Sequence, residues 1–159
     1  MYLANELLKV AIEEVRALGI SVPETIEPNV TMIKGFSRWG TCKRIGDRYI
    51  ISLNESLLES GDRKSIMQTL VHEVLHTCKC CMNHGRLWKL YATRVNEKYG
   101  YNVSRTNSAS SLGVEVVKAK YIVQCNGCGK NVLRQRMSRV VSNPEEYRCK
   151  CGGTLSRVK

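Results

Sequence analysis

Three observations predict an α+β fold, in which helices pack on a small sheet and a small β module follows. Segments with the apolar repeat of helices alternate with short runs of β-branched and aromatic residues. A polar stretch without any repeat separates them from a C-terminal segment that carries two close cysteine pairs. The 159 residues suffice for one ordinary core and a small appended module, but not for two large domains.

The first predicted helix lies within residues 1–19, and its apolar positions recur at helical spacing: Leu3, Leu7, Val10, Ala11, Val15 and Leu18. Glutamates interrupt this segment and no small-residue cleavage site follows an apolar run, so we do not interpret it as a targeting segment. No stretch approaches the roughly 20 apolar residues that a membrane span requires. We therefore expect a cytoplasmic protein.

Two strands are predicted next, at residues 30–36 and 48–53, because both runs are rich in β-branched and aromatic residues. Gly46 and Asp47 are placed as the turn between them. A further strand is predicted at 114–123, and short strands are expected to flank the cysteine pairs.

The central predicted helix runs from residue 63 to about residue 77, with Asp62 as its N-cap. Its broad apolar face is typical of a helix buried in a core. A short cysteine-bearing loop leads into another helix, from about residue 85 to residue 99, which Gly100 is expected to end.

The central helix carries the motif His-Glu-x-x-His, formed by His72, Glu73 and His76. Residues four apart lie one above the other on the same face of a helix, so both imidazoles can reach one metal ion. Glu73 lies about 100° further round the helix, where a carboxylate can act as general base on a water without displacing it. Peptide hydrolysis with zinc is the chemistry usually associated with this motif.

A catalytic zinc needs a third protein ligand, and His84 is the one other histidine in the chain. We predict that His84 completes the site from the turn before the next helix. The competing interpretation is a chance match on an amphipathic helix, with His84 as a surface turn residue. The apolar surroundings disfavour it, because a buried His-Glu-His cluster carries a desolvation cost that a bound cation offsets.

Three cysteines, Cys78, Cys80 and Cys81, follow the motif closely. A second metal or a redox switch is conceivable at this place. Three close thiols without other ligands fit no closed metal site, so structural cysteines are the preferred interpretation.

The C-terminal cysteines form two pairs, Cys125 with Cys128 and Cys149 with Cys151, which are separated by 20 residues. Without an export signal a disulfide framework is disfavoured, and four thiolates at this spacing suit a tetrahedral structural zinc. The second pair departs from the usual pattern by having a single intervening residue. We expect metal binding to make this small module fold.

The net charge of +11 is concentrated in the tail, where residues 118–159 contain ten lysines and arginines against Glu145 and Glu146. Such an excess favours phosphate-rich partners, DNA or RNA, through Coulomb attraction and counterion release, although it serves solubility equally well. The predicted organisation is a metallopeptidase domain at 1–103, a linker at 104–117 and a zinc-ribbon module at 118–159.

These residues resemble the SprT-like family, which is related to the Spartan proteases and in which a zinc ribbon often follows a zincin domain. The resemblance rests on Trp39-Gly40-Thr41-Cys42, on Ile50-Ile51-Ser52-Leu53-Asn54 leading to Leu57-Leu58, on the motif from His72 to His76, and on His84-Gly85 followed by Trp88-Lys89. The cysteine tail completes it.

The resemblance implies a zincin-like fold and two zinc ions, one catalytic and one structural. It implies that His72, His76 and His84 are the catalytic ligands, that Glu73 is the catalytic acid/base, and that the four tail cysteines hold the ribbon zinc. The family includes DNA-dependent proteases that remove proteins crosslinked to DNA, which would explain the basic tail.

The sequence therefore predicts a zinc metalloendopeptidase that acts on protein substrates, including DNA-associated or DNA-crosslinked ones. The alternative is a non-catalytic zinc-ribbon adaptor that binds nucleic acid, and an intact Glu73 favours the enzyme. Two alternatives stay open. The strand that aligns the substrate is either 48–53 or the Trp39 segment, and the group that stabilises the oxyanion is a tyrosine, an arginine or the metal alone.

Overall fold

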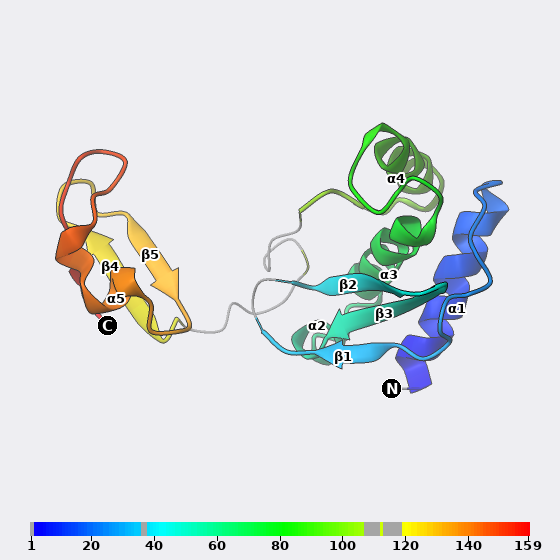
Figure 1. The fold of residues 1–159 in the computed structure, drawn as a ribbon, viewed down its shortest axis with the longest axis horizontal. Helices are drawn as coiled ribbons and strands as arrows, with labels where there is room; N and C mark the ends of the chain where they lie inside the picture. Colours follow the sequence, from blue (N-terminus) through cyan, green and yellow to red (C-terminus); the bar gives the residue numbers. More distant parts are fainter. Residues whose placement is uncertain (1, 36–37, 107–111, 113–118) are drawn as a thin grey trace. The chain divides into compact units, whose positions relative to one another are not determined.

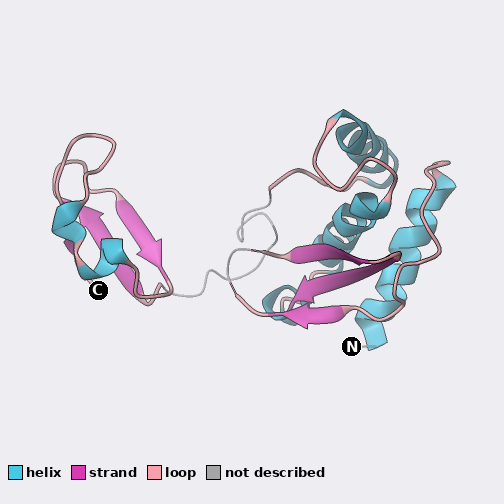
Figure 2. Ribbon diagram, in the orientation of Figure 1, coloured by secondary structure: helices cyan, strands magenta, loops and turns pink. Residues whose placement is uncertain are grey.

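The computed structural model describes residues 2–35, 38–106, 112 and 119–159 (Figures 1 and 2). The chain divides into two compact units, Met1–Glu115 and Val116–Lys159, each with a three-stranded sheet of its own. Helices and strands are both present in each unit. The predicted α+β class is confirmed at this level.

The sheet of the first unit has the order β1-β3-β2. The central strand is β3 (Arg48–Asn54), which pairs in parallel with β1 (Thr31–Ile33) and antiparallel with β2 (Gly40–Ile45). Burial along β3 rises toward its C-terminal end, where all four last residues are buried. This end therefore lies over the core of the unit.

The strand β2 was not predicted from the sequence. The strand predicted to precede the turn at Gly46, residues 30–36, is also wrong. Gly46, at φ 58°, and Asp47 join β2 to β3, not β1 to β3. The segment does not show clean alternation, because β2 is an edge strand whose second half is exposed and carries Lys43 and Arg44. Edge strands commonly carry such charges.

Helix α3 (Arg63–Thr77) is the central element, and twelve of its fifteen residues are buried. It packs against β2, β3, α4 (Arg86–Tyr99) and α1 (Tyr2–Ala17). Figure 1 shows α1 and α3 on one face of the sheet. The side chains of α3 are consequently fixed from several sides.

The predicted ends of these helices are confirmed. Asp62 caps α3, since its carboxylate accepts a hydrogen bond of 3.1 Å from the backbone N–H of Ser65. Gly100 ends α4 in the left-handed conformation, at φ 66°. A short helix that the sequence analysis did not predict, α2 (Glu55–Glu59), is capped by the Asn54 side chain.

The predicted linker 104–117 lies mainly outside the described residues. Its described part belongs to the first unit. The Ser104 carbonyl contacts His72, Arg105 and Thr106 line the cavity beside that histidine, and Leu112 is fully buried in the main core. The strand predicted at 114–123 also falls partly outside the description, and the observed strand there is β4 (Tyr121–Cys125).

The second unit is built on a sheet with the order β5-β4-β6, in which β4 pairs antiparallel with β5 (Asn131–Arg134) and β6 (Leu155–Arg157). A four-residue helix α5 (Arg139–Ser142) and a 3-10 turn (Pro144–Glu146) complete it. Its buried core consists of Val123, Cys125, Val141 and Leu155. Across the described parts of both units, no helix is long and apolar enough to cross a bilayer.

Candidate metal centre

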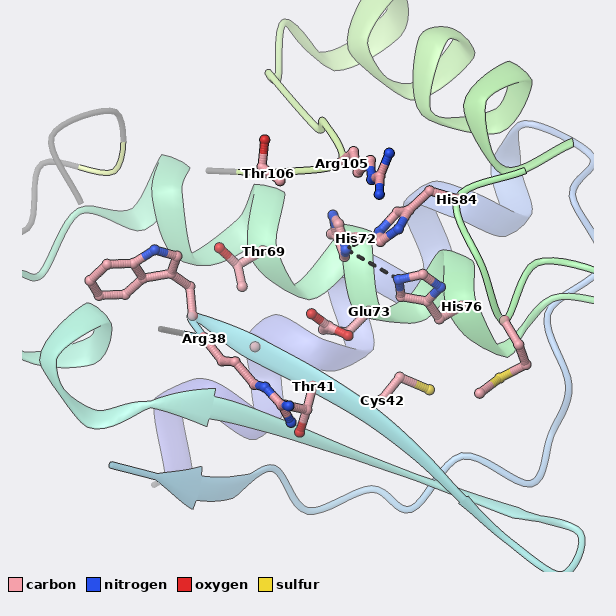
Figure 3. Close-up of a pocket in the computed structure, with 13 residues that line it drawn as sticks. Arg38, Thr41, Cys42, Thr69, His72, Glu73, His76, His84, Arg105 and Thr106 are labelled. Carbon is pink, nitrogen blue, oxygen red and sulfur yellow. Dashed lines mark hydrogen bonds between the residues drawn. The ribbon is translucent and has the colours of Figure 1, made fainter. Parts of the chain in front are cut away.

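Three imidazoles converge at the C-terminal half of α3 (Figure 3). Nε2 of His72 lies 3.2 Å from Nε2 of His76 and 3.0 Å from Nε2 of His84. The first two side chains stand one helical turn apart on α3, and the third comes from the loop before α4. The structure thus brings together the three histidines that the sequence analysis singled out.

Backbone carbonyls fix the orientation of two of these rings. Nδ1 of His72 lies 3.0 Å from the carbonyl oxygen of Ser104, and Nδ1 of His76 lies 2.8 Å from that of Cys81. A carbonyl oxygen can only accept, so Nδ1 carries the proton in both rings. The Nε2 lone pairs are then free and point at one another, as in histidines that bind a metal.

The spacing of the nitrogens fits a tetrahedral zinc site. With Zn–N bonds of about 2.0–2.1 Å, two ligands of a tetrahedron stand about 3.3 Å apart, close to the 3.0 and 3.2 Å observed. Burial lowers the pKa of all three imidazoles, that of His72 to about 3. The rings are therefore neutral near pH 7, which is the form that binds metals.

Trp88 forms an aromatic floor beneath the three rings. Its side chain is 1% exposed, and its ring centroid lies 4.8 Å from that of His72, 5.7 Å from His76 and 4.5 Å from His84. In the sequence, Trp88 was noted as part of the family resemblance, and no role at the metal site was predicted for it. Its contact with the histidines depends on how the loop before α4 folds back over α3, which no local pattern reveals.

Glu73 follows His72 on α3 and faces the same cavity. The residue is 5% exposed, and burial raises the pKa of its carboxyl group to about 8. A cation held by the histidines favours the charged form and moves that pKa back down. Burial and a bound cation thus shift the pKa of Glu73 in opposite directions. A pKa between these two limits suits a group that must accept and return a proton near neutral pH.

The cavity around these groups has a volume of about 410 Å³. One wall is α3 with Thr69, and the opposite wall is the start of β2, with Thr41 and Cys42. Trp39 and Gly40 also line the cavity. The remaining lining residues are Arg38, Met82, Arg105 and Thr106. The site is thus a cleft between a buried helix and the edge strand β2.

Four further cysteines belong to the first unit, but the metal-binding groups among the described residues include none of them. Cys78 and Cys81 are buried and Cys80 is exposed. Cys42 lines the cavity, where burial, with the nearby Glu73 and Cys78, raises the pKa of its thiol to about 12. A thiol held so firmly in its neutral form is a poor nucleophile.

The four tail cysteines form a second cluster in the other unit, with all four sulfurs within 4.8 Å of one another. Sγ of Cys125 lies 3.5 Å from that of Cys151, and Sγ of Cys128 lies 3.6 Å from that of Cys149. Two sulfurs of a tetrahedral zinc site, with bonds of about 2.3 Å, stand about 3.8 Å apart. The donor set and its spacing fit zinc despite the single residue between the last two cysteines.

The chain matches the model of the SprT-like family over residues 23–107. It is 30% identical over 112 residues to the germ cell nuclear acidic protein of Drosophila melanogaster, a match that covers 67% of this chain and 10% of that protein. It is 26% identical over 153 residues to the DNA-dependent metalloprotease SPRTN of Danio rerio, covering 83% of this chain and 23% of the relative. It is 28% identical over 126 residues to the DNA-dependent metalloprotease SPRTN of Xenopus tropicalis, a match that covers 69% of this chain and 28% of that relative. The matches thus span between about a tenth and just over a quarter of the length of these relatives.

Proposed function

Because this chain belongs to the SprT-like family, we propose that it is a zinc-dependent endopeptidase of zincin-like architecture with its active site in the cleft between α3 and β2. The observation that carries this proposal is the set of three converging Nε2 atoms with a buried glutamate beside them on the same helix. A purely structural zinc would not require a desolvated base facing an open cavity.

In this proposal His72, His76 and His84 hold the zinc, and Glu73 is the general base. Bound zinc would supply a Lewis acid that polarises the scissile carbonyl and acidifies water. Glu73 takes the proton of the attacking water and passes it to the leaving nitrogen. The carbonyls of Ser104 and Cys81 keep two of the ligands in the required tautomer.

We place the substrate backbone along β2. Of the two segments that the sequence left open, 48–53 forms the central strand β3, whose two edges are already paired. Within the described part of the chain, β2 pairs with β3 alone, and its first residues line the cleft. An extended peptide can therefore add to this edge by backbone hydrogen bonds.

The cysteine unit is proposed to hold a structural zinc and to contact nucleic acid. One end of its sheet gathers basic side chains around an aromatic ring, with the Arg157 guanidinium 5.1 Å and the Lys120 ammonium 5.6 Å from the Tyr121 centroid. Arg134 lies opposite Tyr121 in the strand register. Such a set can contact phosphates and stack on a base, which supports proteins associated with or crosslinked to DNA as the substrate class.

The test compares wild-type protein with Glu73→Gln, a change that keeps the shape of the side chain and removes its basicity. Both are loaded with zinc and incubated with a DNA-binding protein such as a histone, with and without single-stranded DNA. We expect about two zinc ions per chain in both proteins, and cleavage by the wild type alone. His72→Ala is expected to lose one zinc, and Cys125→Ser the other.

Single-stranded DNA is expected to bind both proteins equally and to stimulate cleavage by the wild type. Cleavage that persists in Glu73→Gln would overturn the assignment of the base. If the wild type binds DNA but never cleaves, the non-catalytic adaptor is the better account of this chain.

A further inference from the structure

Hydrolysis of a peptide bond develops negative charge on the carbonyl oxygen, and a preorganised donor beside that oxygen lowers the barrier. The described lining of the cleft contains no tyrosine, and its two cationic side chains are Arg38 and Arg105. Figure 3 shows that they lie on different sides: Arg105 stands beside His72 and His84, whereas Arg38 extends along the β2 wall toward Thr41. Arg105 is therefore the cationic donor next to the histidines.

The segment that carries Arg105 is pinned to the helices by side chains. The backbone N–H of Asn102 donates to Oε1 of Gln68 at 3.2 Å, a glutamine of α3 that is only 5% exposed. Asn96 of α4 binds Val103 twice, accepting from its N–H at 2.7 Å and donating to its carbonyl at 3.0 Å. The Ser104 carbonyl then meets Nδ1 of His72 at 3.0 Å.

These contacts hold residues 102–104 against the middle of α3 and the second half of α4, and residue 105 follows directly at the cleft. Each contact is a hydrogen bond between one side chain and one backbone group, so this segment is held in place and does not have the freedom of a linker. The backbone at Arg105 therefore has little freedom to move. A donor held in place in this way is what electrostatic preorganisation requires.

The guanidinium itself is available for a ligand. Arg105 is exposed, and among the described residues no carboxylate forms an ion pair with it. Its charge also contributes to lowering the pKa of His84, after burial and the charge of His76, which agrees with its position beside that ring.

We propose that Arg105 binds the anionic oxygen of a ligand at the histidine site, and that in the peptidase reaction this is the oxygen of the scissile carbonyl. The catalytic part of the inference rests on the proposed function. As the water oxygen bonds to the carbonyl carbon, the π electron pair moves onto the carbonyl oxygen, to which Arg105 donates. The pair then returns, the C–N bond breaks, and Glu73 gives the proton of the water to the leaving nitrogen.

The first measurement compares the kinetics of wild type, Arg105→Ala and Arg105→Lys, all zinc-loaded. Loss of an oxyanion donor typically lowers kcat about 10²–10³-fold, and we expect this for Arg105→Ala with zinc content and KM little changed. Added guanidinium chloride at millimolar concentration is expected to restore part of the activity of Arg105→Ala but not of Glu73→Gln. Arg86→Ala is the matched control, because Arg86 is also exposed and near His84 in the chain but lines a different hollow on α4.

The second measurement does not depend on turnover. Binding of inorganic phosphate, a tetrahedral anion, to each zinc-loaded protein is followed by calorimetry. We expect binding at least ~10-fold weaker in Arg105→Ala than in wild type and Arg86→Ala, since a charge-assisted contact contributes about 1.5–3 kcal/mol.

The outcomes separate the two proposals. If the wild type cleaves and Arg105→Ala cleaves equally well, Arg105 has no catalytic role and the inference is overturned while the peptidase stands. If the wild type never cleaves, the proposed function fails, and phosphate binding becomes the test of Arg105. Weaker phosphate binding in Arg105→Ala alone supports Arg105 as the oxyanion-binding group. Equal phosphate binding in all variants excludes that role.

Discussion

Gly40 of β2 lies directly against the Glu73 carboxylate: a Cβ on Gly40 would stand 2.7 Å from Oε1 and 2.9 Å from Cγ of that side chain. The same Cβ would lie 2.9 Å from Cγ2 of Thr69. Contacts this short require something to move. The absence of a side chain at this position is therefore what allows the edge strand and the proposed base to face each other closely.

The substitution Gly40→Ala is predicted to displace the Glu73 carboxylate without removing the metal. A displacement of about 1 Å at a reacting group can cost about 10²-fold in rate, so we expect a loss of that order in kcat with an unchanged zinc content. Lys98→Ala, at an exposed position of α4, is the control and is expected to retain activity. Full activity in Gly40→Ala would show that the carboxylate position is not critical.

Replacing Trp88 by alanine is predicted to destabilise both the first unit and its metal site. Loss of a buried tryptophan costs about 3–5 kcal/mol, and the three imidazoles lose their common floor. Thermal unfolding with and without zinc measures the first effect, and zinc content after dialysis measures the second. Trp88→Phe keeps an aromatic ring and should retain most of the zinc, whereas equal zinc retention in Trp88→Ala would contradict the proposed role of the floor.

The Asp62 cap gives a prediction about pH. Its hydrogen bond from Ser65 lowers the pKa of the carboxyl, so the folded protein is stabilised by the charged form. This stabilisation is present above the ordinary aspartate pKa of about 3.9 and is lost as the pH falls through the lower folded value. Asp62→Ala is expected to cost about 1 kcal/mol in urea unfolding at pH 7, and Asp62→Asn much less. An Asn variant as unstable as the Ala variant would argue against the cap.

Thiol labelling distinguishes the roles of the cysteines. Burial raises the pKa of Cys42 to about 12 and that of Cys78 to about 11, so their reactive thiolates appear only at strongly alkaline pH. With zinc bound at the tail cluster, we expect exposed Cys80 to react first with iodoacetamide at pH 8, as read by mass spectrometry of peptides. Rapid labelling of Cys42 at pH 8 would contradict the buried environment.

In the tail cluster, Gly153 lets its backbone lie close to Cys125 and Gly127. It does not adopt a backbone angle that favours glycine. A Cβ there would stand 2.7 Å from Sγ of Cys125 and 3.1 Å from the backbone N of Gly127. Gly153→Ala is predicted to lower zinc retention in the second unit, seen as a fall from about two zinc ions per chain toward one. Lys150→Ala, at the exposed position between two cysteines, should keep both ions, and a Gly153→Ala protein that also keeps both would refute the steric argument.

The local parts of this protein were determined by the sequence alone. The spacing of His72, Glu73 and His76 on one helix, the Asp62 cap and the Gly100 end follow from interactions within a few residues, and the structure has them where the sequence places them. The two cysteine pairs are likewise close in sequence. Such features can be predicted because the geometry of a helix or a tight turn is set by its own residues.

Contacts between distant segments were decided only by the tertiary structure. The carbonyl of Ser104 meets His72 across 32 residues of chain, and nothing in that polar stretch indicated a role in the site. The floor formed by Trp88 and the closeness of Gly40 to Glu73 depend in the same way on packing around α3. The physical reason is that these contacts arise from burial of the shared core, which depends on the whole fold and leaves no local periodic pattern.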